Sequence, residues 1–277
     1  MIRMLAALVI ALFTSLLSSA STAHASQAWG VTVGNSTSID LRRIEIATGD
    51  VSTLSRSGDS LLFANVDDLA SDPVRHPRLV WAVRTSGNGN ELIAVDPYLE
   101  QIVSLATIDA AETILAIAID PLTGAMYGTS TNALYTIDAF NGESTLVGAT
   151  ADPVTSGLGF DLSGRLFGVG APQAGPSAEF VEIDTADASL NMIGTLVTNG
   201  VLDIAADPTD GVMYGLGPNV YQLVSIDLAS SDVTPVGDSL SRPGGLAFTG
   251  VPEPASATIC ISALFSLLLA SSRSRWE

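Results

Sequence analysis

Five acidic residues are candidates for chemistry, because they fall in the loops that join successive copies of an internal repeat. They are Asp59, Asp109, Glu112, Asp152 and Asp238. If they converge, they could hold Ca²⁺, which takes about six to eight oxygen ligands from flexible loops. Two of them could instead form an acid/base pair acting on a glycoside. Loop aspartates also serve as turn formers and solubilising residues, so the sequence favours no bound cofactor and keeps calcium as the alternative.

Other reactive side chains are too few for most enzymatic sites. The chain holds 1 Cys and 2 His. Cys260 lies in an apolar C-terminal segment and His24 near the N-terminus, which leaves His76 alone in the body, in an expected turn between prolines. Zinc and copper sites need clusters of His or Cys, and a Ser-His-Asp triad would depend on His76 alone. The sequence therefore predicts no such site.

The charge balance excludes one class of partner. The formal net charge is −18, and the chain contains no lysine. A surface of this kind repels the phosphates of nucleic acids, so no nucleic-acid partner is expected.

The elements that must position these carboxylates are short strands. Residues 114–119 form an apolar run that suits a buried strand, and an Asp-Pro turn with Gly124 follows. Residues 125–129, 133–137 and 143–147 complete a set of four strands, the last two joined across an Asn-Gly turn. Four antiparallel strands in about 35–45 residues are typical of one β-propeller blade.

Copies of this unit fill residues 26–250, and the two ends are complementary fragments. The N-terminal end has strands two to four of a blade, and residues 244–248 supply an isolated inner strand. Pairing them would close the ring and remove two open sheet edges. The sequence thus predicts an all-β, five-bladed propeller of four-stranded antiparallel blades. Six blades are the alternative, if residues 55–65 or 170–178 conceal a divergent one.

Two residue types recur at fixed places in the blades. Asp120, Asp138, Asp184, Asp207 and Asp227 end strands and begin turns, which predicts turn chemistry and not a binding site. An aromatic residue recurs on the second strand, and we expect it to pack between neighbouring sheets. These aromatic residues are Trp81, Tyr127, Phe167 and Tyr214.

Residues 1–25 have the features of a secretory signal peptide. Arg3 supplies a positive charge, residues 5–17 are apolar, and Ala23 and Ala25 form an A-x-A cleavage site for signal peptidase. The mature chain is therefore expected to begin at Ser26.

Residues 251–277 form a separate C-terminal signal. Val251, Pro252, Glu253 and Pro254 precede an uncharged segment, residues 255–270, and Arg273 and Arg275 form a basic end. This order resembles the PEP-CTERM sorting signal of Gram-negative bacteria. The resemblance implies export, transient membrane retention by a hydrophobic helix, cleavage by an exosortase-type protease, and delivery to the cell surface or an exopolysaccharide matrix. The alternative is an ordinary C-terminal anchor.

The body also resembles a group of exported bacterial propellers that often carry this tail, a resemblance that implies no activity. The sequence therefore favours an exported cell-surface or extracellular-matrix propeller acting as a non-catalytic structural or binding module, with exopolysaccharide as a candidate partner. The alternative is a carboxylate-dependent glycosidase or lyase acting on exopolysaccharide. A close pair of buried carboxylates in an open axial cleft would favour the enzyme.

Overall fold

A computed structural model describes residues 27–33, 39–44, 46, 51–53, 66–86, 89–99, 101–151, 154, 157–170, 178–196, 201–217, 222–239 and 243–250. These residues belong to one compact unit, Ser26–Gly250. Their regular structure is entirely β-strand. None of them lies in a helix that is long and apolar enough to span a membrane. The expected signal peptide and the C-terminal hydrophobic segment lie outside the described residues.

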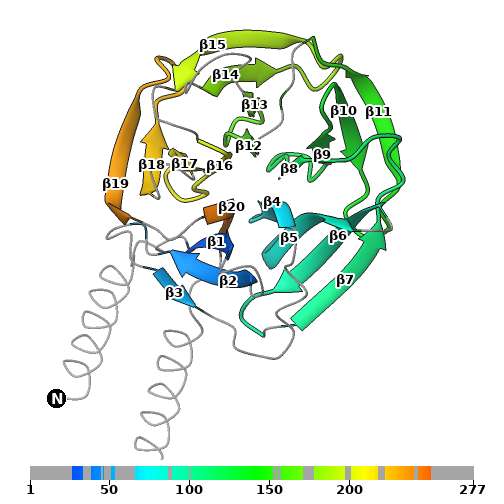
Figure 1. Cartoon of the computed structure of the whole chain (residues 1–277), viewed down its shortest axis with the longest axis horizontal. Coiled ribbons are helices and arrows are strands. Elements are labelled where there is room, and N and C mark those ends of the chain that lie inside the picture. Colours follow the sequence, from blue (N-terminus) through cyan, green and yellow to red (C-terminus); the bar gives the residue numbers. More distant parts are fainter. Residues whose placement is uncertain are drawn as a thin grey trace, which may run out of the picture. The chain divides into compact units, whose positions relative to one another are not determined.

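The strands form a β-propeller, with four-stranded antiparallel sheets arranged around a central axis (Figure 1). Four sheets each consist of four consecutive strands. They are β4 (Val66–Asp72), β5 (His76–Ser86), β6 (Gly89–Asp96) and β7 (Gln101–Thr107); β8 (Ala116–Ile119), β9 (Met126–Thr129), β10 (Ala133–Ile137) and β11 (Ser144–Ala149); β12 (Gly157–Phe160), β13 (Leu166–Gly170), β14 (Ala178–Ile183) and β15 (Leu190–Leu196); and β16 (Asp203–Ala206), β17 (Met213–Gly217), β18 (Gln222–Ile226) and β19 (Val233–Ser239).

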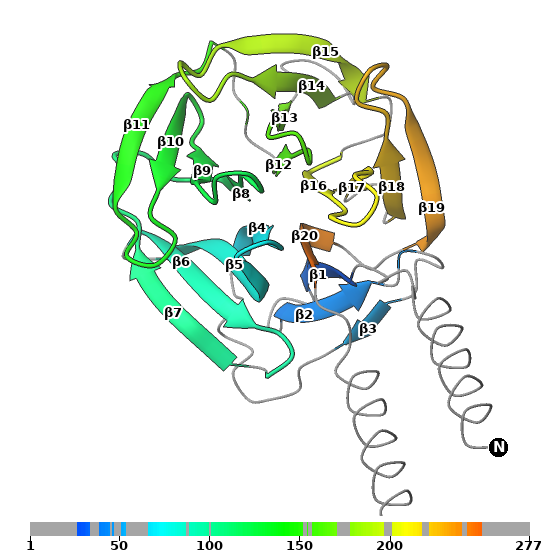
Figure 2. The ribbon, with the colours of Figure 1, turned by 180° about the vertical axis from the view of Figure 1, so that it is seen from behind.

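A fifth sheet joins the two ends of the body, as the complementary fragments predict. Its order is β20-β1-β2-β3, where β20 is Pro243–Thr249, β1 is Gln27–Val33, β2 is Ile39–Ile44 and β3 is Val51–Thr53. Trp29 pairs with Ala247, and Gln27 pairs with Thr249. Figure 2 shows β20 completing the inner ring of strands beside β4. The expected pairing of the N- and C-terminal fragments is confirmed. Most of the two segments considered for a sixth blade lies outside the described residues.

Burial falls from the axis to the rim, which explains the composition of each strand. All four residues of β8 are buried, whereas every residue of β11 is half-buried or exposed. A strand buried on both faces reads as a continuous apolar run, as β8 does. The inner strands are therefore the more apolar ones, and the outer strands mix apolar and polar residues.

The recurring aspartates are turn formers, as expected. The Asp138 carboxylate accepts the amides of Phe140 and Asn141 at 2.9 and 3.0 Å. Asp120, Asp184, Asp207 and Asp227 each accept the amide of the residue two positions later, at 2.7–2.8 Å. Gly142 completes its turn at a φ of 80°, where glycine avoids the penalty that a Cβ would bring.

The recurring aromatic residues pack between neighbouring sheets, which confirms the prediction. Trp81 of β5 is fully buried, and its indole N–H donates to the carbonyl of Ala139, which follows β10 in the next sheet, at 3.0 Å. The rings of Tyr127 and Phe160 lie 5.6 Å apart across another boundary between sheets, and those of Tyr214 and Phe248 lie 5.5 Å apart. Phe167 joins a buried cluster that includes Ile204 and Met213 of the following sheet.

His76 differs from its expected place in an exposed turn. It is the first residue of β5, and its ring packs edge-on against Trp81 and Phe140 at 5.6 and 5.3 Å. The strand begins one residue before Pro77 because Asp72 pairs directly with His76 across a tight turn. The histidine is therefore part of an aromatic contact between two sheets.

Candidate functional site: an axial pair of carboxyl groups

Of the predicted loop carboxylates, Asp109 is fixed at a joint between sheets. Its Oδ1 accepts the amide of Ser144 at 2.6 Å, and its own amide donates to the carbonyl of Gly142 at 3.2 Å. The hydrogen bonds from Ser144 lower the pKa of this exposed carboxyl. Asp109 therefore lies beside the turn that joins β10 to β11, and it ties the loop after β7 to that turn.

Glu112 is exposed and has a separate partner. Its Oε2 accepts the hydroxyl of Ser130, which follows β9, at 2.5 Å. Asp59 and Asp152 lie outside the described residues. Asp238 belongs to β19, but its side chain is not among those described. Asp109 and Glu112 therefore lie in the same loop, between β7 and β8, but bind different partners.

The two candidates whose side chains are described, Asp109 and Glu112, do not form a metal site together. Within the part of the chain that the structure describes, no three His, Cys, Asp or Glu side chains lie together as a metal site would require. A site holding Ca²⁺ at a hundred times its dissociation constant would stabilise the fold by about 2.7 kcal/mol. For a domain of this size, that corresponds to a rise of about 5–10 °C in the unfolding midpoint.

We expect millimolar Ca²⁺ to leave the thermal midpoint of the chain unchanged at fixed ionic strength. The comparison is with chelator, with Mg²⁺ as the control for general charge screening. A rise specific to Ca²⁺ would show that the carboxylates converge after all. Substituting Asp59, Asp109 and Asp152 with Asn would then identify which of them bind the ion.

The structure instead reveals a pair of carboxyl groups that the sequence reasoning missed. Asp68 on β4 and Asp203 on β16 are both 0% exposed, and their carboxyl groups are hydrogen-bonded to each other. We call these two residues the axial pair. They come from different sheets, with β20 of the fifth sheet between them around the ring (Figure 1).

Backbone amides surround the axial pair. Asp68 accepts the amide of Leu69 with Oδ1 and that of Ile117 on β8 with Oδ2, both at 2.8 Å. Asp203 accepts the amide of Ile204 at 2.7 Å with Oδ1, and that of Leu246 on β20 with Oδ2. All four carboxyl oxygens therefore bind main-chain N–H groups, and four inner strands contribute one amide each.

The inner strands present these amides because each is the last strand of its sheet. In an antiparallel pair, alternate amides point towards the partner strand, and the others point away from it. No strand pairs with the inner edge of β4, β8, β16 or β20. The N–H groups that point inward from these four strands therefore need other acceptors. The axial pair supplies those acceptors, and it ties four separate sheets together.

Small residues at the equivalent places of the other sheets make room for the pair. The strand registers align Asp68 and Asp203 with Ala116, Gly157 and Gly245. A Cβ on Gly157 would lie 2.6 Å from the Cα of Asp203, and one on Gly245 would lie 2.8 Å from Cγ of Leu69. The inner strands approach so closely that only two of these five positions carry a side chain longer than alanine.

Electrostatics favours one proton on the axial pair. Burial, followed by the neighbouring Asp203 carboxyl, raises the pKa of Asp68 well above its usual range. Burial also raises the pKa of Asp203, to about 7. Two buried carboxylates in contact repel each other, whereas a shared proton converts the repulsion into a hydrogen bond. The four amides then stabilise the remaining negative charge.

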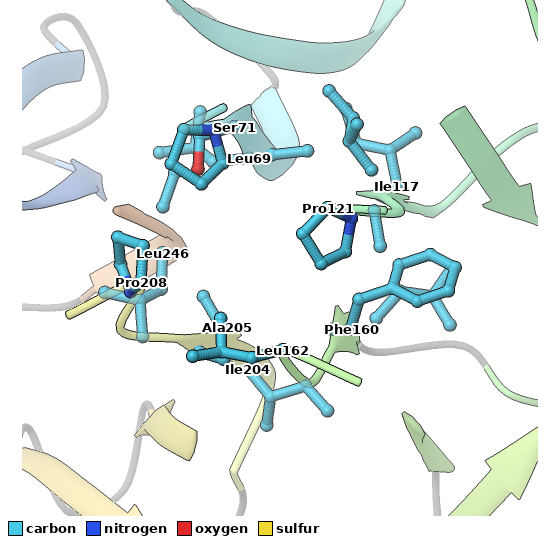
Figure 3. Close-up of a pocket in the computed structure, with 18 residues that line it drawn as sticks. Leu69, Ser71, Ile117, Pro121, Phe160, Leu162, Ile204, Ala205, Pro208 and Leu246 are labelled. Carbon is cyan, nitrogen blue, oxygen red and sulfur yellow. The ribbon is translucent and has the colours of Figure 1, made fainter. Parts of the chain in front are cut away.

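A narrow apolar funnel opens at one side of the axis, with a volume of about 50 Å³. Figure 3 shows Leu69, Ile117, Phe160, Ile204 and Leu246 arranged around its centre. The residues that line it on β4 and β16 begin one position after Asp68 and Asp203, and neither member of the axial pair is among them. The funnel can hold a few water molecules, and it leaves the axial pair buried.

One signal in the sequence could have revealed the pair. In an alignment of the inner strands, Asp68 and Asp203 stand where the other copies have Ala or Gly. A charged residue inside an otherwise apolar inner strand is an exception that needs a partner.

Comparisons with known proteins support the fold alone. No protein-family model matches the chain, and no curated protein is significantly similar to it. A chain in the crystal structure of a nidogen/laminin complex is 13% identical with a TM-score of 0.54, covering 81% of this chain and 98% of that one. TolB from Acinetobacter baumannii is 11% identical with a TM-score of 0.51, covering 80% of this chain, which spans 54% of TolB.

Proposed function

We propose that this chain is an exported propeller that acts as a non-catalytic binding or structural module of the cell surface or extracellular matrix. The observation that carries the proposal is the environment of the axial pair. Its four carboxyl oxygens are all occupied by backbone amides, and both side chains are fully buried. The groups best suited to acid/base chemistry thus hold the inner strands together.

The aromatic residues support the same conclusion. Trp81 and Phe167 are buried between sheets, and Tyr127 and Tyr214 contact aromatic rings of the next sheet. None of these four rings is free to serve as a platform for sugar stacking. A partner would therefore bind the outer surface or the rims of the ring.

The partner that we propose is exopolysaccharide of the matrix. With a net charge of −18, the chain would bind a neutral or cationic polymer more readily than a polyanion. The propeller in the nidogen/laminin complex comes from a protein assembly, which illustrates that the fold can serve such a role. Delivery would depend on the sorting signal at Val251–Pro254 and on the exosortase-type protease that reads it.

The alternative, a glycosidase or lyase, fits the axial pair poorly. Retaining glycosidases keep their two carboxyl groups about 5–5.5 Å apart, and inverting enzymes about 6.5–9.5 Å apart. The carboxyl groups of Asp68 and Asp203 are in direct hydrogen-bond contact, so neither a sugar nor a water molecule can stand between them.

A sedimentation assay with the organism's own matrix polysaccharide tests the proposal. We expect the purified chain to sediment with the polymer and to release no new reducing ends. If the chain stays in solution at both low and high ionic strength, the binding role is wrong. Release of reducing ends by the purified chain would support the enzyme instead.

Delivery is tested separately by the mass of the C-terminal peptide from the protein recovered at the cell surface. Sorting predicts a new C-terminus near Pro252–Pro254. A surface protein that still ends at Glu277 would show that the tail is an ordinary anchor.

A further inference from the structure

We propose that Asp68 and Asp203 form a proton-dependent clasp, in which one shared proton allows the axial pair to hold four inner strands and thereby locks the closing strand β20 into the ring. The inference is independent of the partner that the propeller binds. It rests on the hydrogen bonds of the pair and on the position of β20.

The clasp reaches the sheet at which the ring closes. Strand β20 belongs to a sheet assembled from both ends of the body, and it is held there only by non-covalent contacts. Asp203 binds the amide of Leu246 in the middle of β20. Asp68 belongs to β4, the strand next to β20 around the ring, and binds β8 on its other side. Loss of the proton would place two negative charges together beside that joint.

The charged and titratable groups on the strands packed around the pair are engaged elsewhere. On β4, Asp67 accepts the hydroxyl of Thr85 at 2.8 Å, and Asp72 accepts the amides of its own turn. On β5, Arg78 and Arg84 form ion pairs with Asp96 and Glu91, and His76 packs against aromatic rings. On β17, Tyr214 packs against Phe248. Strands β1, β8, β12 and β20 carry no ionisable side chain. Each carboxyl of the pair therefore has the other as its main electrostatic neighbour.

The direction of the pH effect follows from the raised pKa values. In the unfolded chain both carboxyls titrate near pH 4, whereas in the folded chain their pKa values are higher, that of Asp203 reaching about 7. Between these limits the folded chain binds more protons than the unfolded chain. Stability therefore decreases as the pH rises through this window, by about tenfold in the unfolding equilibrium constant per pH unit for each extra proton.

Urea unfolding at pH 5, 6 and 7, at fixed ionic strength, tests the clasp in the full chain. Asp68→Asn removes the shared proton, and Glu143→Gln removes one charge from an exposed turn as the matched control. For the wild type and Glu143→Gln, we expect the unfolding equilibrium constant to rise by up to about tenfold for each pH unit. Asp68→Asn should be less stable than the wild type at pH 5 and have a flatter pH dependence. Parallel curves for the wild type and Asp68→Asn would overturn the proposal.

A measurement on the wild type alone covers the case in which the Asn variant does not fold. Unfolding by urea in unbuffered solution at pH 6 should release at least one proton per chain, because both carboxyls hold protons more tightly in the folded chain and ionise fully in the unfolded one. The carboxyls with lowered pKa values, such as Asp161 and Asp227, are ionised in both states at this pH and do not contribute. Burial also raises the pKa of Asp67, so the same measurement on Asp67→Asn separates its contribution from that of the pair. Absence of proton release would show that the pair carries no shared proton.

Discussion

Truncation after residue 242 should abolish cooperative unfolding and leave a chain that associates. It removes β20, including Leu246 and Phe248, which are 0% and 1% exposed. Loss of one buried Leu or Phe commonly costs about 2–5 kcal/mol, and a whole domain is stable by only about 5–15 kcal/mol. The truncation also exposes the edge of β1 that pairs with β20, and an open strand edge pairs readily with another chain. Size-exclusion chromatography and urea unfolding measure both effects.

Truncation after residue 250 is the matched control, since it removes the C-terminal tail and keeps β20 paired with β1. This control should not aggregate and should unfold in a single transition. If the chain ending at residue 242 also unfolds cooperatively at the same urea concentration, ring closure does not stabilise the fold.

Trp81→Ala should destabilise the fold by about 3–5 kcal/mol, the usual cost of removing a fully buried large aromatic residue. The indole lies between two sheets, with ring centroids of Phe140 and His76 at 6.0 and 5.6 Å. Its N–H also satisfies the carbonyl of Ala139. The variant therefore loses apolar contacts and a hydrogen bond that joins one sheet to the next. Urea unfolding at pH 6 measures the difference.

Trp81→Phe separates the two contributions, because it keeps an aromatic ring and loses the indole N–H. We expect it to cost less than half as much as Trp81→Ala, in line with about 0.5–1.5 kcal/mol for a hydrogen bond plus a smaller loss of packing. Near-wild-type stability of Trp81→Ala would mean that the contact between these sheets tolerates a cavity, contrary to the burial of the ring.

Features that repeat along the chain could be predicted from the sequence. Asp138 and Gly142 define a turn through local backbone chemistry, so their roles follow from a few neighbouring residues. The pairing of β1 with β20 could also be predicted, because one end lacks the strand that the other end provides. The second prediction depends on comparing one copy of the repeat with another.

The functional site could not be predicted in the same way. Asp109 was one of five loop carboxylates that could have converged, but the first residues of its loop continue from β7 and meet the turn at Gly142. Asp68 and Asp203 lie 135 positions apart in the sequence (203 − 68) and meet only because their strands flank β20. Their contact depends on the closed ring, and a local sequence pattern contains no information about that geometry.

The fifth sheet, which joins the two ends of the body, also affects when the fold can be completed during synthesis. A chain is made from its N-terminus, so β1 exists long before residues 243–249 have been added. Until then β1 has no partner on its inner side, and Asp203 has no Leu246 amide to bind. Joining the ends of so long a segment also carries the largest loop-closure entropy of any strand pairing in the body. The last of the described strands to be synthesised is thus the one that turns a curved row of sheets into a ring.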